Sequence, residues 1–149
     1  MIRKANLLCV VACVAATPSF ATLGEGESSV DNDRVKLRAV LHGSETPFYS
    51  LHSITTAQGV HVGEYVSRSG VVFAVCWDGP FLPDLRQLLG VHFVTFKSEV
   101  ARTPHAGHSQ VSIVRPEVVI QSTGHMRSFR GSAFIPAAVP AGLTLAQIR

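Results

Sequence analysis

Cysteine is scarce in this chain. Of its three cysteines, Cys9 and Cys13 lie in the first apolar run, and Cys76 is the only one in the rest of the sequence. Once that run is removed, the single thiol cannot form an intrachain disulfide, so core packing must supply the stability. The scarcity also excludes a cysteine-rich metal box, and we expect no metal site.

Charged and aromatic residues are also few. Charged residues make up 15% of the 149 residues and aromatic residues 7%, with a single tryptophan. When Arg3 and Lys4 are set aside, eleven basic residues stand against ten acidic ones. The sequence has neither a Walker loop nor a dinucleotide fingerprint, and its charge is scattered. We therefore expect no cofactor and no nucleic-acid partner.

The N-terminus has the pattern of an export signal. Two basic residues precede an apolar run at 5–16, which is shorter than the roughly twenty residues that a helix needs to cross a bilayer. Small residues at Ser19 and Ala21 suit signal peptidase. The sequence predicts a signal peptide at 1–21 and one exported domain at 22–149, in the periplasm or the medium, without a transmembrane span.

A second form of processing remains open at the same end. The tetrapeptide Val10-Val11-Ala12-Cys13 is similar to the box that directs lipoprotein processing in bacteria, in which the cysteine is acylated. One diacylated Cys13 would anchor the domain to a membrane surface.

Three β-rich segments follow a break at His42–Pro47: Phe48–Thr56, Val60–Ser67 and Val71–Trp77. The three-residue links between them end in Gly59 and Gly70, which suits hairpin loops whose last residue has φ > 0. We predict a three-stranded antiparallel meander. Of the segments before it, 22–32 is polar and is expected to be a loosely docked arm, and 34–41 is either a strand or a short helix.

The third segment has apolar residues on both faces. Alternation places Phe73, Val75 and Trp77 on one face and the smaller residues Val72, Ala74 and Cys76 on the other. We expect both faces to be covered, with the small-residue face suited to a closely packed helix.

One amphipathic helix is expected after the Asp78-Gly79-Pro80 stop. Apolar residues recur at helical spacing from Leu85 to Val100, Asp84 is the natural N-cap, and Gly90 is a point where the helix could kink or end. Two more strands are expected, at 111–123 with an interruption at Pro116 and at 126–135, joined near Gly124. The predicted fold is α+β: a mainly antiparallel sheet, composed of a meander and a C-terminal hairpin, packed against one helix.

Cys76 is the first residue to consider for catalysis. A nucleophilic cysteine needs a base beside it, and His125 is the histidine we pair with it in an enzyme hypothesis. A thiol in mid-strand is more often a small buried hydrophobic group. Other catalytic patterns are incomplete: the pair His105 and His108 has no third ligand, and Ser109 lacks the second glycine of a nucleophile elbow. Carboxylates for glycoside hydrolysis would come from Glu64, Asp78, Asp84 and Glu117, of which Glu64 is expected at an exposed strand position.

The densest polar cluster lies near the C-terminal hairpin. Gly124-His125-Met126-Arg127-Ser128-Phe129-Arg130-Gly131 combines an imidazole, two guanidiniums and an aromatic ring. Arg127 and Arg130 differ by an odd number of positions, so a regular strand would point them to opposite sides. His125, Arg127, Arg130 and the nearby Trp77 are our candidate binding residues.

Several motifs together resemble a known family. They are Gly63-Glu64-Tyr65-Val66-Ser67, Trp77-Asp78-Gly79-Pro80, the helix start Pro83-Asp84-Leu85 and the turn Gly124-His125-Met126-Arg127. The chain resembles a family of small exported proteins of Gram-negative bacteria catalogued as a domain of unknown function, number twenty-eight forty-four. The resemblance implies export and a single domain, and it implies no activity.

Two functions remain. The first is a non-enzymatic domain that binds an envelope protein or cell-surface material through the exposed side of its sheet and the hairpin at 125–130. The second is a small thiol- or histidine-dependent hydrolase built on Cys76 with His125 or another histidine.

Overall fold

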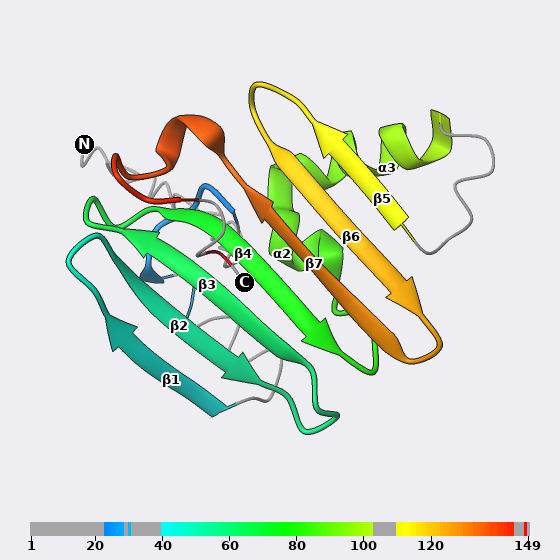
Figure 1. The fold of residues 1–149 in the computed structure, drawn as a ribbon, viewed down its shortest axis with the longest axis horizontal. Coiled ribbons are helices and arrows are strands. Elements are labelled where there is room, and N and C mark those ends of the chain that lie inside the picture. The colour runs from blue at the N-terminus through cyan, green and yellow to red at the C-terminus, as the bar shows by residue number, and fades with distance from the viewer. Residues whose placement is uncertain (1–22, 29, 31–39, 103–109, 145–147, 149) are drawn as a thin grey trace, which may run out of the picture.

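The fold is built on one seven-stranded sheet. The computed structural model describes residues 23–28, 30, 40–102, 110–144 and 148. The strands are β1 (Val40–Glu45), β2 (Tyr49–Thr55), β3 (His61–Ser67), β4 (Val72–Gly79), β5 (Gln110–Val114), β6 (Val119–His125) and β7 (Ser128–Phe134). Their order across the sheet is β1-β2-β3-β4-β7-β6-β5, and every neighbouring pair is antiparallel (Figure 1). The predicted α+β class with a mainly antiparallel sheet is confirmed.

The two glycine-ended hairpin loops form as predicted. Gly59 and Gly70 have φ of 79° and 77°, in the left-handed region that only glycine adopts at little cost. The loop before β3 is closed by Thr56 N–H donating to Val60 O at 2.9 Å, and the loop before β4 by Ser67 N–H donating to Val71 O at 2.9 Å. Local turn chemistry thus sets the register of β2, β3 and β4.

Two other expectations about strands were wrong. Residues 42–45, expected as part of a break, lie in β1, because pairing with β2 can impose extended structure on an edge segment that has no hydrophobic alternation. The segment 111–123 is two strands, because the chain reverses at Arg115, whose N–H donates to Val118 O at 3.0 Å, and β5 then pairs with β6. The sheet therefore has seven strands, where the sequence predicted five, or six if 34–41 is a strand.

The helical segment is broken at Gly90. Helix α2 (Leu85–Leu89) begins after Asp84, whose Oδ1 accepts hydrogen bonds from Arg86 N–H and Gln87 N–H, so the predicted N-cap is confirmed. Gly90 has φ of 49° and ends α2; a 3₁₀ turn η1 (Gly90–His92) leads into α3 (Phe93–Arg102), and a second one, η2 (Pro136–Ala138), follows β7. Among the helices that the structure describes, none has the length and apolar character needed to cross a bilayer.

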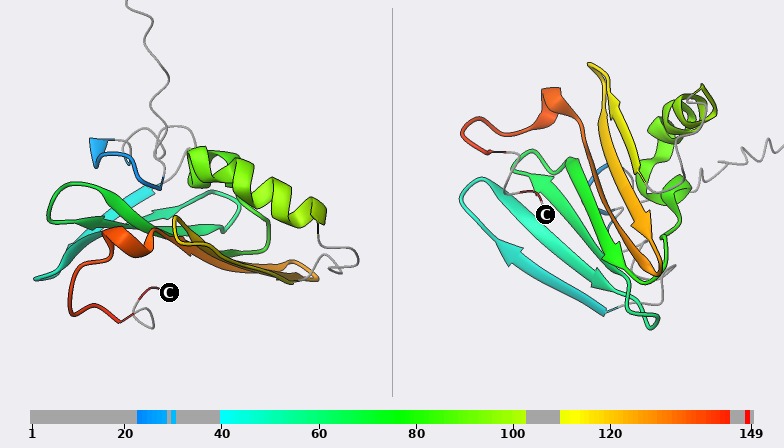
Figure 2. Two further views of the ribbon diagram at one scale, coloured as in Figure 1. Left: turned by 90° about the horizontal axis from the view of Figure 1, so that it is seen from above. Right: turned by 45° about the vertical axis from the view of Figure 1, so that its right-hand side comes forward.

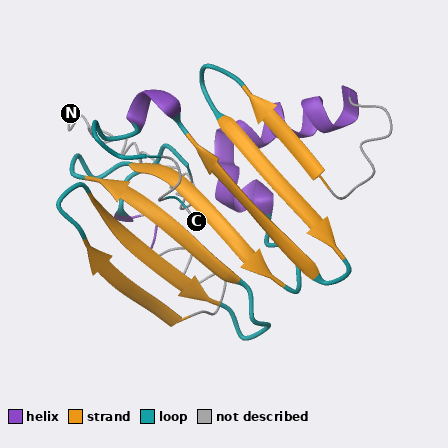
Figure 3. Cartoon of the chain, viewed as in Figure 1, coloured by secondary structure: helices purple, strands orange, loops and turns teal. Residues whose placement is uncertain are grey.

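Helices α2 and α3 cover one face of the sheet (Figures 2 and 3). Leu85, Leu88 and Leu89 of α2 are buried in one core cluster with Val75 and Trp77 of β4. The expectation that the helix lies over the small-residue face of β4 was wrong, because the leucines pack over the side that carries Val75 and Trp77.

The opposite face of β2–β4 forms a second cluster. Tyr49, Tyr65 and Phe73 are in mutual ring contact, with centroids 5.3–6.4 Å apart, and the C-terminal segment after β7 packs against them. Phe73 lies here, together with Ala74 and Cys76, because a register shift between β3 and β4 at Tyr65 and Val66 breaks the alternation of side chains. The expectation that Phe73 shares a face with Trp77 was therefore wrong.

The described part of the N-terminal segment is docked rather than loose. Gly24 N–H donates to Val72 O at 2.8 Å, and Leu23 N–H donates to Leu88 O at 3.2 Å. Leu23 and Val30 are buried in the cluster below the helices. Backbone hydrogen bonds and two apolar anchors hold the segment, and neither produces a periodic sequence pattern.

Candidate functional site

Three connections meet at one end of the sheet. The β2–β3 turn, the loop from β4 to α2 and the β6–β7 turn all lie at the end where the arrows of β2, β4 and β6 point (Figure 1). The β1–β2 and β3–β4 turns lie at the opposite end. The antiparallel strand order alone thus brings together loops that are far apart in the sequence.

The tip of the β6–β7 hairpin is Met126-Arg127. Both residues have positive φ, 39° and 66°, as a two-residue turn of this kind requires, although glycine or asparagine usually supplies it. The turn expected near Gly124, within Gly124-His125-Met126-Arg127, is present with its tip two residues after Gly124, and Gly124 itself lies within β6 opposite Phe129. A Cβ at Gly124 would lie 2.6 Å from Phe129 Cδ1, so glycine is needed there to make room for the ring.

The two arginines of the hairpin have separate contacts. Arg130 Nε donates to Asp78 Oδ2 at 2.6 Å, across the pairing of β4 with β7. Arg127 Cζ lies 5.7 Å from the centroid of the Phe81 ring, a cation–π contact. Among the residues that the structure describes, no carboxylate forms an ion pair with Arg127. Its described contact is therefore the Phe81 ring.

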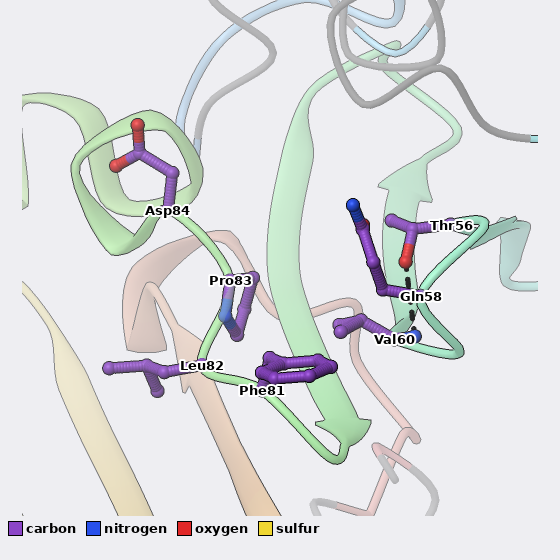
Figure 4. A pocket seen from close by; sticks show the side chains of 7 residues that line it. All are labelled: Thr56, Gln58, Val60, Phe81, Leu82, Pro83 and Asp84. Atoms are coloured by element: carbon purple, nitrogen blue, oxygen red, sulfur yellow. Dashed lines mark hydrogen bonds between the residues drawn. The ribbon is translucent and has the colours of Figure 1, made fainter.

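A groove lies beside this contact. It has a volume of about 480 Å³ and is open to solvent; its walls are Thr56, Gln58, Val60, Phe81, Leu82, Pro83 and Asp84 (Figure 4). Phe81 and Leu82 are each 48% exposed. Thr56 Oγ1 accepts a hydrogen bond from Val60 N–H at 3.1 Å and fixes one wall. We call this surface the Phe81 groove.

The side of β5–β7 turned away from α2 and α3 is polar, and we call it the open face. The strand registers place Asp78, Arg130, Thr123 and Gln110 in one row across it. Ser132, Gln121 and Ser112 form the next row, which begins at Cys76. Most of these side chains are exposed, and the C-terminal segment packs over β2–β4 instead (Figure 2). The open face meets the Phe81 groove at the hairpin.

Cys76 has the wrong electrostatics for a nucleophile. Burial raises the pKa of its thiol above the usual 9.0; hydrogen bonds to Gly63 and Tyr65 lower it by less, and the Asp78 charge adds to the rise. A catalytic cysteine needs the opposite shift, because the thiolate is the reactive form.

His125 is remote from this thiol. Gln121 of β6 lies in the same row as Cys76, two strands away across the sheet. His125 lies four residues further along β6. That is roughly 13 Å along the strand and about 10 Å across the sheet. His61 is closer in register, two residues from the partner of Cys76, but its Nδ1 is 3.0 Å from Thr55 Oγ1. Within the part of the chain that the structure describes, no hydrogen bond joins a histidine to Cys76.

Trp77 and Glu64 are both buried. Trp77, a candidate binding residue on a strand face that was expected to be covered, is 1% exposed and lies in the core. Glu64, expected at an exposed position, is 1% exposed on the face below the N-terminal segment, opposite His52 of β2. Strand alternation alone could not predict this, because the N-terminal segment that packs on that face is a long-range contact.

Comparison with known proteins identifies the family. A family model described as "Protein of unknown function (DUF2844)" matches residues 19–148. The chain belongs to this family. No curated protein and no solved structure matches it. The DUF2844 family has no described activity, so the candidate site is defined by the geometry of the Phe81 groove and the β6–β7 hairpin.

Some predicted features of this DUF2844 chain lie outside the described residues. These are the signal peptide with Cys9 and Cys13, the pair His105 and His108, and Ser109. Among the described residues, no group of three or more His, Cys, Asp or Glu side chains is placed to hold a metal ion.

Phe81, Leu82 and Gln58 were not among the residues predicted from the sequence. The signal for the first two was present, since two large apolar residues stand between Pro80 and Pro83, outside any strand or helix. Loop residues of this kind often remain exposed for binding. Gln58 gave no signal, because it joins the groove only through the packing of the β2–β3 turn against the β4–α2 loop.

The thiol of this DUF2844 chain is expected to react slowly while the protein is folded. A maleimide at neutral pH should modify Cys76 much more slowly in the native than in the denatured chain, because the raised pKa leaves less thiolate. The native rate should rise only at pH above the ordinary thiol range. A Ser44→Cys variant, at an exposed position of β1, provides the reactive control. Equal rates in native and denatured protein would contradict the interpretation of Cys76 as an unreactive, buried thiol.

Proposed function

We propose that this protein is an exported, non-enzymatic binding domain of the bacterial envelope or the medium. The observation that carries the proposal is the Phe81 groove: two half-exposed apolar side chains lie beside a guanidinium that has no carboxylate partner among the described residues. An isolated exposed apolar residue is common, whereas a groove with an available charge at its rim is typical of a recognition surface. Export is supported by the signal-like pattern of residues 1–21.

The proposed ligand is an envelope protein or cell-surface material. The groove would take an apolar group, Arg127 would pair with an acidic group, and the open face would add polar contacts from its serine, threonine and glutamine side chains. Arg130 would contribute less, because Asp78 already holds its guanidinium. Burial of the partner's apolar group would supply most of the affinity, and the charge would supply orientation.

The thiol-hydrolase alternative has less support. Its nucleophile has a raised pKa, and its proposed base, His125, is distant along β6. Asp78, the carboxylate on the same face, is paired with Arg130.

Two matched pairs of variants test the binding proposal. Phe81→Ala and Arg127→Ala should fold like the wild type but lose the partner in cross-linked pull-downs from the envelope. Phe48→Ala and Arg102→Ala should keep it: Phe48 is 49% exposed at the opposite end of the sheet, and Arg102 is an exposed arginine at the end of α3. We expect a loss of tenfold or more for each groove variant, about 1.4 kcal/mol.

A photo-reactive residue placed at Leu82 should give the same adduct as the pull-down, and one at Val94, which is 73% exposed on α3, should not. The mass of the recovered protein shows whether the signal peptide has been removed, and we expect the mass of residues 22–149. If Phe81→Ala and Arg127→Ala retain every partner, the groove is not the binding site.

A further inference from the structure

Strand β5 is an open edge of the sheet. It is last in the strand order, and β6 is the only described strand that pairs with it. All five of its residues pair with β6 in one continuous register from Gln110 to Val114, without a bulge. The backbone N–H and C=O groups that point away from β6 therefore form a straight row on which another strand can pair.

The usual protection against edge pairing is absent from β5. Edge strands are commonly blocked by a charge, a proline or a bulge, and the sequence Gln110-Val111-Ser112-Ile113-Val114 contains no charge and no proline. Val114 is 73% exposed. The other edge strand, β1, carries the charge of Glu45 and the flexible Gly43.

Apolar side chains at the border of the core also remain partly exposed along this edge. Helix α3 lies against β5, and Arg115 Nη2 contacts Glu99 Oε1 at 2.5 Å beside it. Although α3 is amphipathic, none of its ten residues is fully buried by the described chain. Phe96 and Val111 are only half-buried where they pack against the core, and Val100 is 37% exposed. Whatever pairs with β5 can thus also cover apolar surface on the helix side.

We propose that a second copy of this chain occupies this edge, with β5 of each copy paired antiparallel across a two-fold axis at Ser112. This register is self-complementary. Val111 then lies opposite Ile113 of the second copy on the helix side, and Ser112 lies opposite Ser112. Gln110 lies opposite Val114 on the open face. β-branched side chains such as those of Val and Ile pack well against their neighbours on a pleated sheet.

A second copy supplies both a strand that pairs with β5 and a surface that covers the apolar residues of α3. A two-fold axis normal to the sheet keeps the helices of both copies on the same side, so α3 of each copy approaches the partly exposed apolar side chains of the other. A short extended peptide would supply the strand but no cover for Phe96 and Val100. The result is one continuous fourteen-stranded sheet, twice the seven strands of each copy.

Cross-linking at matched edge positions locates the interface. In the full chain with Cys9, Cys13 and Cys76 replaced by alanine, Ser112→Cys should be joined to a second copy by a short bis-maleimide. Ser44→Cys, an exposed serine on the other edge strand, should not be joined. Native mass measurement of the wild type should give twice the chain mass. A wild type that stays monomeric at high concentration, or cross-linking through Ser44→Cys alone, would overturn the proposal.

A charge swap tests the register. Ser112 is exposed, so Ser112→Lys and Ser112→Glu should each fold, as circular dichroism can verify. Each variant alone places like charges opposite one another and should raise the dimer dissociation constant roughly fivefold or more. Mixing the two variants should restore association as a heterodimer. If Ser112→Lys dimerises as tightly as the wild type, the two-fold axis is not at Ser112 and the proposal fails.

Discussion

Replacing Gly131 with alanine is expected to destabilise the protein by about 3 kcal/mol or more. Gly131 stands opposite Trp77 in the pairing of β4 with β7. A Cβ at this position would overlap Cζ2 of the Trp77 ring and would lie 2.5 Å from Gln121 O. Trp77 is fully buried and Gln121 O belongs to the backbone of β6, so neither can move without disrupting the core. Denaturant unfolding followed by circular dichroism measures the loss.

Gly43→Ala is the matched control for this change. Gly43 is also a strand glycine, but a Cβ there would meet no atom within 4 Å. We expect its effect to lie within about 0.5 kcal/mol of zero, as for other exposed substitutions. If both variants unfold at the same denaturant concentration, Trp77 does not pack on β7 as described.

Replacing Leu88 with alanine is expected to cost about 2–5 kcal/mol. Leu88 is 1% exposed and lies in the core cluster that joins α2 to the sheet. The loss combines the transfer of a buried isobutyl group to water with a cavity between helix and sheet. Chemical denaturation of the purified variant tests this directly.

Leu82→Ala provides the contrast, because Leu82 is the same residue type, 48% exposed, in the loop just before α2. It should change the free energy of unfolding by well under 1 kcal/mol. Since Leu82 lines the Phe81 groove, the same variant should weaken partner binding. A large loss of stability from Leu82→Ala would mean that the groove is a structural contact instead of a recognition surface.

The candidate site was predictable only in part. His125, Arg127 and Arg130 could be selected from the sequence because they cluster around a turn. Their separate partners could not, since Asp78 and Arg130 are 52 residues apart and meet only through the pairing of β4 with β7. Trp77 was selected for its residue type, and the packing of α2 over its face removed it from the surface.

The sequence by itself determined what depends on neighbouring residues. Gly59 and Gly70 specified two hairpin loops, because only glycine readily adopts their positive φ. Asp84 specified the start of α2, because its carboxylate accepts the first free N–H groups of the helix.

The tertiary structure alone decided what depends on distant residues. The strand order placed β7 beside β4 and left β5 at an edge. The shift of register at Tyr65 moved Phe73 to the opposite face from Trp77. The meeting of the β2–β3 turn and the β4–α2 loop at one end created the Phe81 groove. Each of these depends on contacts between segments far apart in the chain, whose free energy comes from burial and strand pairing and leaves no local pattern in the sequence.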